Sequence, residues 1–347
     1  MESLCKRSNR GLHVRRIVLL FTLLCAAALQ PAFGQSFTVK DLGTLPHGFV
    51  SKALGINDHG EVVGESAVDG LFQPHAFSFE NGVMVDLGTL PGFNPFSEAL
   101  GINKRGQIAG FSGAIVLFEF AVLIEDGVMV KLPTLPGAGD NNNQALAIND
   151  HGEVVGFSGA HAFLFEHGAI TDLGTLPGGT SSKAAAINDR GQIVGQSTTA
   201  SGDMHAFLYD DGVMIDLGTL GGNFSSATGI NHHGEIVGVA NTASGEMHAF
   251  VFEHGVMTDL GTLPGGTSSR ATAINDSGQI VGSSSTANSS THAFLFDDGR
   301  MIDLGTLPGG NFSEALGINK HGQVVGDSTA TNTLNHATLW TAAHSKK

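Results

Sequence analysis

The sequence predicts an all-β fold, and three observations narrow it to one architecture. Four short phrases recur in a fixed order along the chain, they recur every 41 to 45 residues, and no helix-length periodic segment interrupts them. The phrases are rich in Val, Ile, Phe and Leu and are bounded by Gly, Asn and Asp, which is typical of short strands joined by tight turns. Four antiparallel strands in each repeat of about 44 residues are the unit of a β-propeller blade.

Each phrase occurs seven times, and each is expected to form one strand of the repeat. The first, Asp-Leu-Gly-Thr-Leu, begins at Asp41, Asp86, Lys131, Asp172, Asp216, Asp259 and Asp303. The second centres on Ile-Asn at Ile56, Ile102, Ile148, Ile187, Ile230, Ile274 and Ile318. The third, Gly-(Glu/Gln)-(Val/Ile)-(Val/Ala)-Gly, ends at Gly64, Gly110, Gly156, Gly195, Gly238, Gly282 and Gly326. The fourth, His-Ala-Phe, begins at His75, Phe120, His161, His205, His248, His292 and His336.

Tight turns and strands covered on both faces are expected within each repeat. Residues 57–60, Asn-Asp-His-Gly, and their copies join the second phrase to the third, where Asn or Asp favours a turn and Gly takes the left-handed position. In residues 205–209 both alternating faces carry apolar side chains. Such strands are buried on both sides, as in sheets stacked face to face around an axis.

The repeat count predicts seven blades and a way to close the ring. Residues 37–45 form an isolated strand of the first type, whereas residues 336–340, of the fourth type, form the last strand. Each lacks a partner within its own repeat, and unpaired strand edges are unfavourable. We therefore predict a seven-bladed β-propeller with four antiparallel strands per blade, closed by the N-terminal strand.

The N-terminal segment has the order of a cleaved secretory signal. Five basic residues between Lys6 and Arg16 precede an apolar run over 17–29, and Ala-Phe-Gly at 32–34 is a small-x-small cleavage site. The apolar run is too short for a typical transmembrane helix. We predict a signal peptide over 1–34, a single β-propeller domain over 35–347, and secretion to the periplasm or the extracellular space.

Charge and cysteine content exclude several partners. Residues 1–34 carry five basic side chains and one acidic side chain, so their removal changes the formal net charge from −15 to −19. Nucleic acid is a poor partner for such a surface. Both cysteines, Cys5 and Cys25, leave with the signal, which excludes disulfides and Cys-ligated metals from the mature chain. We also expect no membrane span in the mature chain.

The phrases resemble a known repeat family. His-Ala-Phe, Gly-Ile-Asn-Asp-x-Gly-Gln-Ile-Val-Gly and Met-x-Asp-Leu-Gly-Thr-Leu-Pro-Gly-Gly together are similar to the bacterial extracellular HAF-repeat family, over about residues 37–340. Phe120 and Lys131, both in the second repeat, depart from its pattern. The resemblance implies a secreted repeat protein of undetermined biochemical role, and it supplies no catalytic residues.

The repeated polar residues favour a structural role over chemistry. The six phrase histidines lie on different blades, and packed sheets are about 10 Å apart, whereas zinc ligands lie at about 2.0 to 2.1 Å. We therefore expect each histidine to form a hydrogen bond within its own blade, and we give Asp86 and its copies the same role. Tyr209 takes the position of Phe165 and is expected in the core. No catalytic, cofactor-binding or metal-binding residue is assigned, and weak calcium binding is the one alternative left open.

The repeats differ most in the loops on one face. The second repeat replaces a polar connection with an apolar one, and the loop entering the third repeat is rich in amides. An apolar loop beside a polar rim is typical of an interaction site. The predicted binding residues are Ile115, Val116, Leu117, Phe118, Asp140, Asn141, Asn142 and Asn143. The alternative is that residues 115–120 fold onto their own blade.

These observations favour a secreted, non-catalytic binding or surface-interaction propeller whose partner is a protein or polymer outside the cytoplasm. The reason is that no acid/base pair is seen to depart from the repeat pattern in a way that suggests catalysis. The alternative is a secreted glycan-active enzyme, a hydrolase or lyase, on a propeller scaffold.

Overall fold

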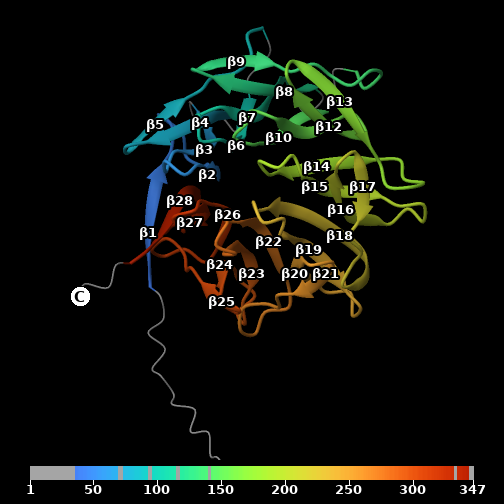
Figure 1. Cartoon of the computed structure of the whole chain (residues 1–347). Helices are drawn as coiled ribbons and strands as arrows, with labels where there is room; N and C mark the ends of the chain where they lie inside the picture. Colours follow the sequence, from blue (N-terminus) through green and yellow to red (C-terminus); the bar gives the residue numbers. More distant parts are fainter. Residues whose placement is uncertain are drawn as a thin grey trace, which may run out of the picture. The chain divides into compact units, whose positions relative to one another are not determined.

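The computed structural model describes residues 36–68, 73–92, 96–114, 118–139, 142–331 and 334–343. In these ranges all strands and turns belong to an all-β fold without helices, so the predicted fold class is confirmed. Ser36–Lys347 form one compact unit, and Figure 1 shows its sheets following one another around a common centre. The predicted signal over 1–34 lies outside the described residues.

The strands are of four types, named here by their position in each sheet. The inner strands are β2 (Ser51–Ile56), β6 (Phe96–Ile102), β10 (Asn143–Ile148), β14 (Ser182–Ile187), β18 (Gly221–Ile230), β22 (Ser269–Ile274) and β26 (Ser313–Ile318). The second strands are β3 (Val62–Ala67), β7 (Ile108–Ala114), β11 (Val154–Ser158), β15 (Ile193–Thr198), β19 (Ile236–Thr242), β23 (Ile280–Ser285) and β27 (Val324–Thr329). The third strands are β4 (Pro74–Glu80), β8 (Phe118–Glu125), β12 (His161–Glu166), β16 (Met204–Asp210), β20 (Met247–Glu253), β24 (Thr291–Asp297) and β28 (Asn335–Ala342). The outer strands are β5 (Val83–Asp86), β9 (Val128–Lys131), β13 (Ala169–Gly174), β17 (Val213–Asp216), β21 (Val256–Asp259), β25 (Arg300–Asp303) and β1 (Phe37–Gly43).

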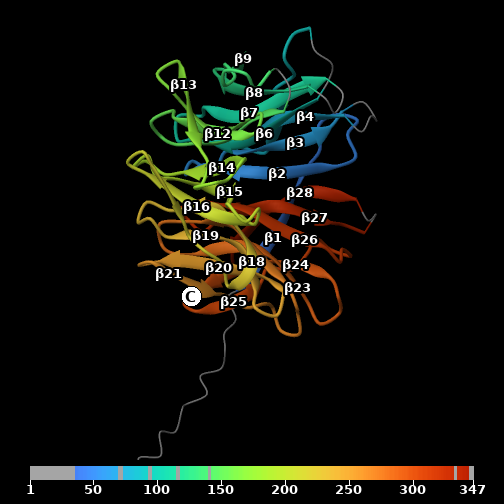
Figure 2. The same cartoon turned by 90° about the vertical axis from the view of Figure 1, so that its right-hand side faces the viewer.

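Neighbouring strands in each group of four are antiparallel, and the first strand of the unit pairs with the last. In that pairing Val39 of β1 lies opposite Trp340 of β28, so the sheet order is β1-β28-β27-β26. The groups β14–β17 and β18–β21 are joined into one sheet by a single parallel bridge between Met204 and Phe224. Figure 2 shows the sheets stacked on one another.

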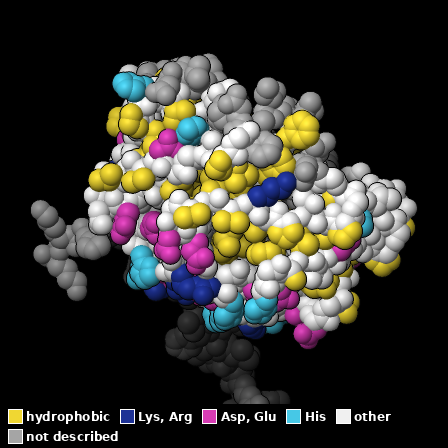
Figure 3. Space-filling model, turned by 90° about the horizontal axis from the view of Figure 1, so that it is seen from above, with side chains coloured by type: hydrophobic (Ala, Val, Ile, Leu, Met, Phe, Trp, Pro, Cys, Tyr) yellow, Lys and Arg dark blue, Asp and Glu magenta, His cyan; other side chains and the backbone are white. Residues whose placement is uncertain are grey.

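The core lies between neighbouring sheets. One cluster, for example, combines Phe77 and Val62 of the first repeat with Val325 and Ala337 of the last. The phenylalanine of the His-Ala-Phe phrase is fully buried in five repeats, at Phe77, Phe163, Phe207, Phe250 and Phe294. Several outer-strand valines are exposed, and hydrophobic side chains gather on the face that Figure 3 shows. Neighbouring sheets cover both faces of the inner three strands of each repeat. This burial explains why neither face of these strands is wholly polar.

The glycine that ends the third phrase is required by close packing of two strands. A Cβ at Gly64 would lie 1.9 Å from the carbonyl oxygen of Lys52 on the neighbouring inner strand, and one at Gly156 would lie 1.9 Å from that of Gln144. A side chain of any size would therefore separate the inner strand from the second strand. This contact explains why glycine recurs at the position.

The first phrase is less regular than predicted, because most of it follows the outer strand instead of forming it. Strand β5 ends at Asp86, and Gly88 has a positive φ of 68° that turns the chain away. The Asp86 side chain stabilises this turn by accepting a 2.7 Å hydrogen bond from Gly88 N. Leu90, at the end of the phrase, is buried and anchors the connection to the next sheet. The phrase is thus mainly a connector between sheets.

Candidate functional site

The repeated histidines and aspartates pair within their own sheets. His75 Nδ1 lies 2.9 Å from Asp86 Oδ2, and His336 Nδ1 lies 2.8 Å from Asp41 Oδ2 on the N-terminal strand. The same contact occurs for His161, His205, His248 and His292. The expected hydrogen bonds within each blade are therefore confirmed, and these residues join the third strand to the outer strand.

The second repeat replaces this pair with a contact of another kind. Lys131 takes the aspartate position and Phe120 the histidine position, and Lys131 Nζ lies 4.0 Å from the centroid of the Phe120 ring. An ammonium over an aromatic face is attracted by the electron density of the ring. The two departures from the phrase pattern therefore compensate one another.

Buried asparagines form a continuous series of hydrogen bonds around the centre. Asn57 Nδ2 donates to Asn103 O at 3.2 Å, each following asparagine donates to the next, and Asn319 Nδ2 donates back to Asn57 O at 3.1 Å. The intermediate donors are Asn103, Asn149, Asn188, Asn231 and Asn275. Each asparagine also holds its own turn, as when Asn57 Oδ1 accepts hydrogen bonds from the backbone. The Ile-Asn phrase thus links the repeats to one another.

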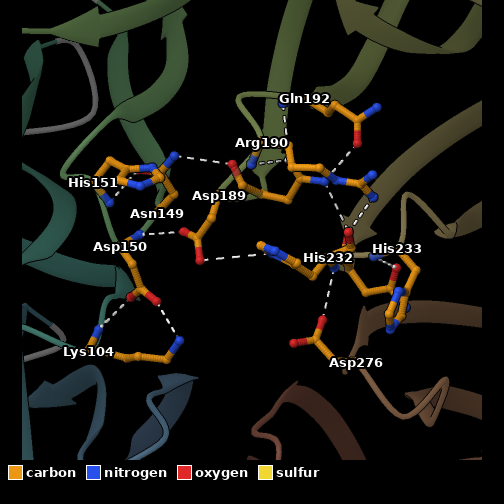
Figure 4. Close-up of polar contacts among 12 residues, drawn as sticks. Lys104, Asn149, Asp150, His151, Asp189, Arg190, Gln192, His232, His233 and Asp276 are labelled. Atoms are coloured by element: carbon orange, nitrogen blue, oxygen red, sulfur yellow. Dashed lines mark hydrogen bonds and ion pairs between the residues drawn. The ribbon is translucent and has the colours of Figure 1, made fainter.

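Charged residues beside the asparagines also contact the neighbouring repeat (Figure 4). Asp189 Oδ1 accepts a 2.8 Å hydrogen bond from Asp150 N, and Lys104 Nζ lies 2.6 Å from Asp150 Oδ2. Burial favours the neutral acid, but hydrogen bonds and charge from Lys104 hold the pKa of Asp150 below its ordinary value. His232 N donates to Asp276 Oδ1 at 2.9 Å. These groups surround a cavity of about 210 Å³, and most of their charges and hydrogen-bonding atoms are paired with one another. This pairing indicates a structural role.

A second cavity, of about 450 Å³, lies between the first and last repeats, at the strand ends opposite the asparagine turns. Lys52, Glu65, Asp327 and Asn335 are among its lining residues. Two of these lining residues interact with carboxyl groups outside the lining: Lys52 with Glu314, and Glu65 with Glu98. We call the group formed by Lys52, Glu65, Glu98, Glu314 and Asp327 the acidic pocket.

The acidic pocket is formed at two positions that face each other across paired strands and that hold different residues in different repeats. Lys52 lies opposite Glu65, and Glu314 lies opposite Asp327. In the third to sixth repeats the inner-strand position holds Gln144, Lys183, Ser226 and Arg270. The facing position in the second to sixth repeats holds Phe111, Phe157, Gln196, Val239 and Ser283. The sequence interpretation missed this group, which a position-by-position alignment of the seven copies reveals.

Lys52 lies at the centre of the acidic pocket. Its Nζ atom is 3.5 Å from Glu314 Oε2 and 3.7 Å from Asp327 Oδ1. Burial tends to lower the pKa of Lys52, but the charges of Asp327, Glu314 and Glu65 outweigh it, so the pKa is raised overall. Lys52 is therefore a permanent cation that holds carboxylates from two sheets together.

Glu65 and Glu98 lie on neighbouring sheets, and their side-chain carboxyl groups are close enough to affect each other's pKa. Burial, with the negative charges of Glu65 and Glu119, raises the pKa of Glu98 to about 8. Burial also raises the pKa of Glu65, although Lys52 and the interaction with Glu98 oppose this effect. At neutral pH Glu98 therefore holds its proton beside a second carboxyl group, an arrangement that also occurs in acid/base sites.

Asp327 is almost fully buried at the base of the acidic pocket. Its side chain is 1% exposed, and its Oδ2 atom accepts a 2.6 Å hydrogen bond from Asn335 Nδ2. Its Oδ1 atom is buried and receives no hydrogen bond. Burial raises the pKa of Asp327 to about 6, although the charge of Lys52 opposes the shift.

Five of the eight binding residues predicted from the loops lie outside the described residues, and the other three can be placed. The five outside are Ile115, Val116, Leu117, Asp140 and Asn141. Phe118 begins β8 and is 45% exposed.

The two remaining residues lie at the start of the third repeat. Asn142 is exposed and has a positive φ of 61°. Asn143, expected on a surface rim, is instead buried, because it replaces the serine that begins most inner strands, and its Oδ1 accepts a 2.6 Å hydrogen bond from Ser158 Oγ. None of the described loop residues belongs to the acidic pocket, although Phe118 begins the third strand of the repeat that contributes Glu98.

The described residues contain neither a grouping suited to a metal ion nor a membrane-spanning helix. No three His, Cys, Asp or Glu side chains in these ranges are grouped so that they could hold a metal ion. In the same part of the chain, no helix is long and apolar enough to cross a membrane.

Solved structures with a similar chain path identify the fold. The β-propeller domain of the Trilobed protease from Pyrococcus furiosus is 12% identical, with a TM-score of 0.56, and the match covers 85% of this chain and 97% of that domain. The fold is a β-propeller. Oligogalacturonate lyase from Vibrio parahaemolyticus is 11% identical, with a TM-score of 0.54 and coverage of 89% and 94%. No family model and no curated protein matches the sequence.

Other similar structures are longer enzymes. Pyrococcus horikoshii acylaminoacyl peptidase is 11% identical, with a TM-score of 0.54, and the match covers 84% of this chain and 51% of the peptidase. The propeller therefore spans about half the length of that protein.

The prediction of a non-catalytic binding propeller is wrong in the light of these findings. The similar propellers belong to hydrolases and a lyase, which favours the enzyme alternative. The residues themselves also offer a candidate acid/base pair, because Glu65 and Glu98 lie close together on neighbouring sheets. At 11–12% identity the comparisons establish the fold alone, so the activity must be argued from the acidic pocket.

Proposed function

We propose that this protein is a secreted glycan hydrolase, with Glu98 as the proton donor and Glu65 as the nucleophile. The observation that carries the proposal is the placement of two carboxyl groups from neighbouring sheets, Glu65 and Glu98, close together in the acidic pocket, where burial raises the pKa of both. Glycoside hydrolysis requires this combination, because one acid protonates the leaving oxygen while one carboxylate attacks the sugar. Glu65, Lys52 and Asp327 line the cavity of about 450 Å³, which is within the usual range for small-molecule sites.

The proposed reaction follows from the protonation states of the pair. Glu98 transfers its proton to the glycosidic oxygen as the bond from this oxygen to the anomeric carbon breaks. Glu65 forms a bond to the anomeric carbon, and water then releases the sugar while Glu98 takes back a proton. The positive charge of Lys52 favours the ionised form of Glu65, which is the form that acts as a nucleophile.

The proposal includes a closed ring of seven blades. The pairing of β1 with β28 supports it, because the last repeat then has four strands like the others. The hydrogen bond from Asn319 to Asn57 also supports it, because the asparagine series returns to its first member. Secretion is proposed from the signal-like order of residues 1–34, and membership of the HAF-repeat family from the repeated phrases.

Incubating the purified mature chain with a panel of defined oligosaccharides tests the function. We expect shorter sugars in the product mass spectra, and we expect the Glu98→Gln variant to lose most of this activity. Lys183→Gln is the matched control, because Lys183 takes the position of Lys52 in the fourth repeat and its ammonium lies over the Phe157 ring instead. A folded wild-type protein that cleaves no member of the panel, or equal activity in Glu98→Gln, overturns the proposal.

A further inference from the structure

The acidic pocket has an imbalance of charge. Four carboxyl groups, those of Glu65, Glu98, Glu314 and Asp327, surround a single ammonium, that of Lys52. A fifth carboxyl group, Glu119, acts on Glu98 from the neighbouring third strand and accepts a 2.7 Å hydrogen bond from Gln144 Nε2. Among the described residues that act on the pocket, Lys52 is the only cation. The pocket therefore has more acceptor oxygens than donors.

One of these oxygens has no donor. Asp327 Oδ1 is buried and receives no hydrogen bond, and the ammonium of Lys52 is 3.7 Å away, beyond normal hydrogen-bond length. A buried carboxylate oxygen without a donor is unfavourable, and a ligand that brings a donor would remove this cost. The cavity beside Asp327 is large enough to admit one.

We propose that the acidic pocket selects glycans with free amino groups, such as glucosamine oligomers, over neutral or acetylated glycans. The inference rests on the proposed function and names its substrate class. A sugar ammonium supplies three donors and one positive charge, which are what the pocket lacks. The formal net charge, −15 for the full sequence and −19 without residues 1–34, also attracts cationic sugars toward the protein and repels uronate-rich ones.

Binding of an ammonium should displace a proton from the pocket. At neutral pH Glu98 holds a proton because its burial and the negative charges of Glu65 and Glu119 outweigh the charge of Lys52. A second cation beside the pair reverses this balance and favours two carboxylates. Proton release on binding is therefore specific to a cationic ligand, because a neutral sugar of the same size leaves the charge balance unchanged.

Calorimetry on the mature chain with three matched hexamers, of glucosamine, N-acetylglucosamine and glucose, tests this inference. Titration at pH 7 in two buffers of different ionisation enthalpy measures the number of protons released. We expect the glucosamine hexamer to bind at least about tenfold more tightly than the others, as one charge-assisted hydrogen bond would give, and to release a proton. Glu98→Gln should abolish the proton release, whereas Lys183→Gln should leave it unchanged.

The outcomes separate this inference from the proposed function. Equal affinity for the three hexamers, or tight glucosamine binding without proton release, overturns the amino-sugar inference, and hydrolysis of the neutral hexamers would still support the hydrolase. Selective, proton-releasing binding of the glucosamine hexamer without cleavage of any sugar supports the recognition chemistry and overturns the hydrolase. Absence of binding and of cleavage overturns both.

Discussion

The side-chain carboxyl groups of Glu98 and Glu65 lie close enough to affect each other's pKa across the boundary between the first and second sheets. The two residues lie on β6 and β3, and no turn or local motif connects them. Burial and the neighbouring charges give them different proton affinities, with Glu98 protonated at neutral pH. This relationship is the basis of the proposed chemistry and of its pH dependence.

Substitution of each member of the pair should have a different effect on catalysis. Glu98→Gln should lower kcat/KM for unactivated oligosaccharides by about 10²- to 10⁴-fold, because no acid protonates the leaving oxygen. The loss should be much smaller for aryl glycosides, whose leaving groups need no proton. Glu65→Gln should lower both rates, because it removes the nucleophile. Equal losses on both substrates in Glu98→Gln would contradict its role as proton donor.

Stability should fall as the pH rises from about 4.5 to about 8. Folded Glu98 holds its proton to about pH 8, whereas the unfolded chain loses it near 4.5, so the unfolded state binds fewer protons in this range. The expected slope is at most about 1.4 kcal/mol per pH unit from this residue. Asp327, whose pKa is raised to about 6, adds to the loss at the acidic end.

Urea unfolding at pH 5, 6.5 and 8 measures this effect. Glu98→Gln should flatten the pH dependence, because glutamine cannot titrate, whereas Glu80→Gln, at an exposed strand end, should leave the wild-type slope. Parallel curves for wild type and Glu98→Gln would show that Glu98 is not a buried acid.

Loss of one asparagine from the central series should destabilise the whole unit. Asn188→Ala removes a 3.0 Å hydrogen bond to Asn231 O and leaves the turn amides of Arg190 and Gln192 without their acceptor. We expect a loss of about 2 to 4 kcal/mol in the free energy of unfolding. Asn288→Ala, in an exposed turn, is the control and should change it by less than about 0.5 kcal/mol. Similar stabilities of the two variants would contradict the proposed linking role.

Deletion of residues 36–45 should lower the melting temperature by about 10 °C or more, because Trp340 loses part of its cover and β28 becomes an edge. Asp172→Asn is a comparison variant, since it weakens the equivalent His–Asp contact in the third repeat without opening a sheet. Differential scanning calorimetry measures both. An unchanged transition in the deletion variant would argue against closure by the N-terminal strand.

The fold could be predicted from the sequence because the same physical constraints apply in each repeat. The Ile-Asn phrase, the glycine beside Lys52 and the buried Phe77 are each needed in nearly every copy, so their period is visible in one sequence. The ends of the strands were harder to predict, because the turn at Gly88 depends on a local hydrogen bond from its amide to Asp86.

The acidic pocket was not accessible in the same way, because its residues are the ones that differ between copies. Lys52 and Glu314 are far apart in the sequence, and their contact depends on the first and last repeats being neighbours. Glu65 and Glu98 meet only because adjacent sheets stack. The sequence instead predicted a binding site in the loops, because a change in loop length is easier to recognise than one changed charge in a strand.

The pH dependence of kcat/KM for oligosaccharide hydrolysis tests the central claim most directly. The wild-type rate should decrease above about pH 8, where free Glu98 loses its proton, and this alkaline limb should be absent from the residual activity of Glu98→Gln. A profile with the same alkaline limb in both proteins, or no measurable hydrolysis by the folded wild type at any pH, would contradict the assignment of Glu98 as the acid of a glycan hydrolase.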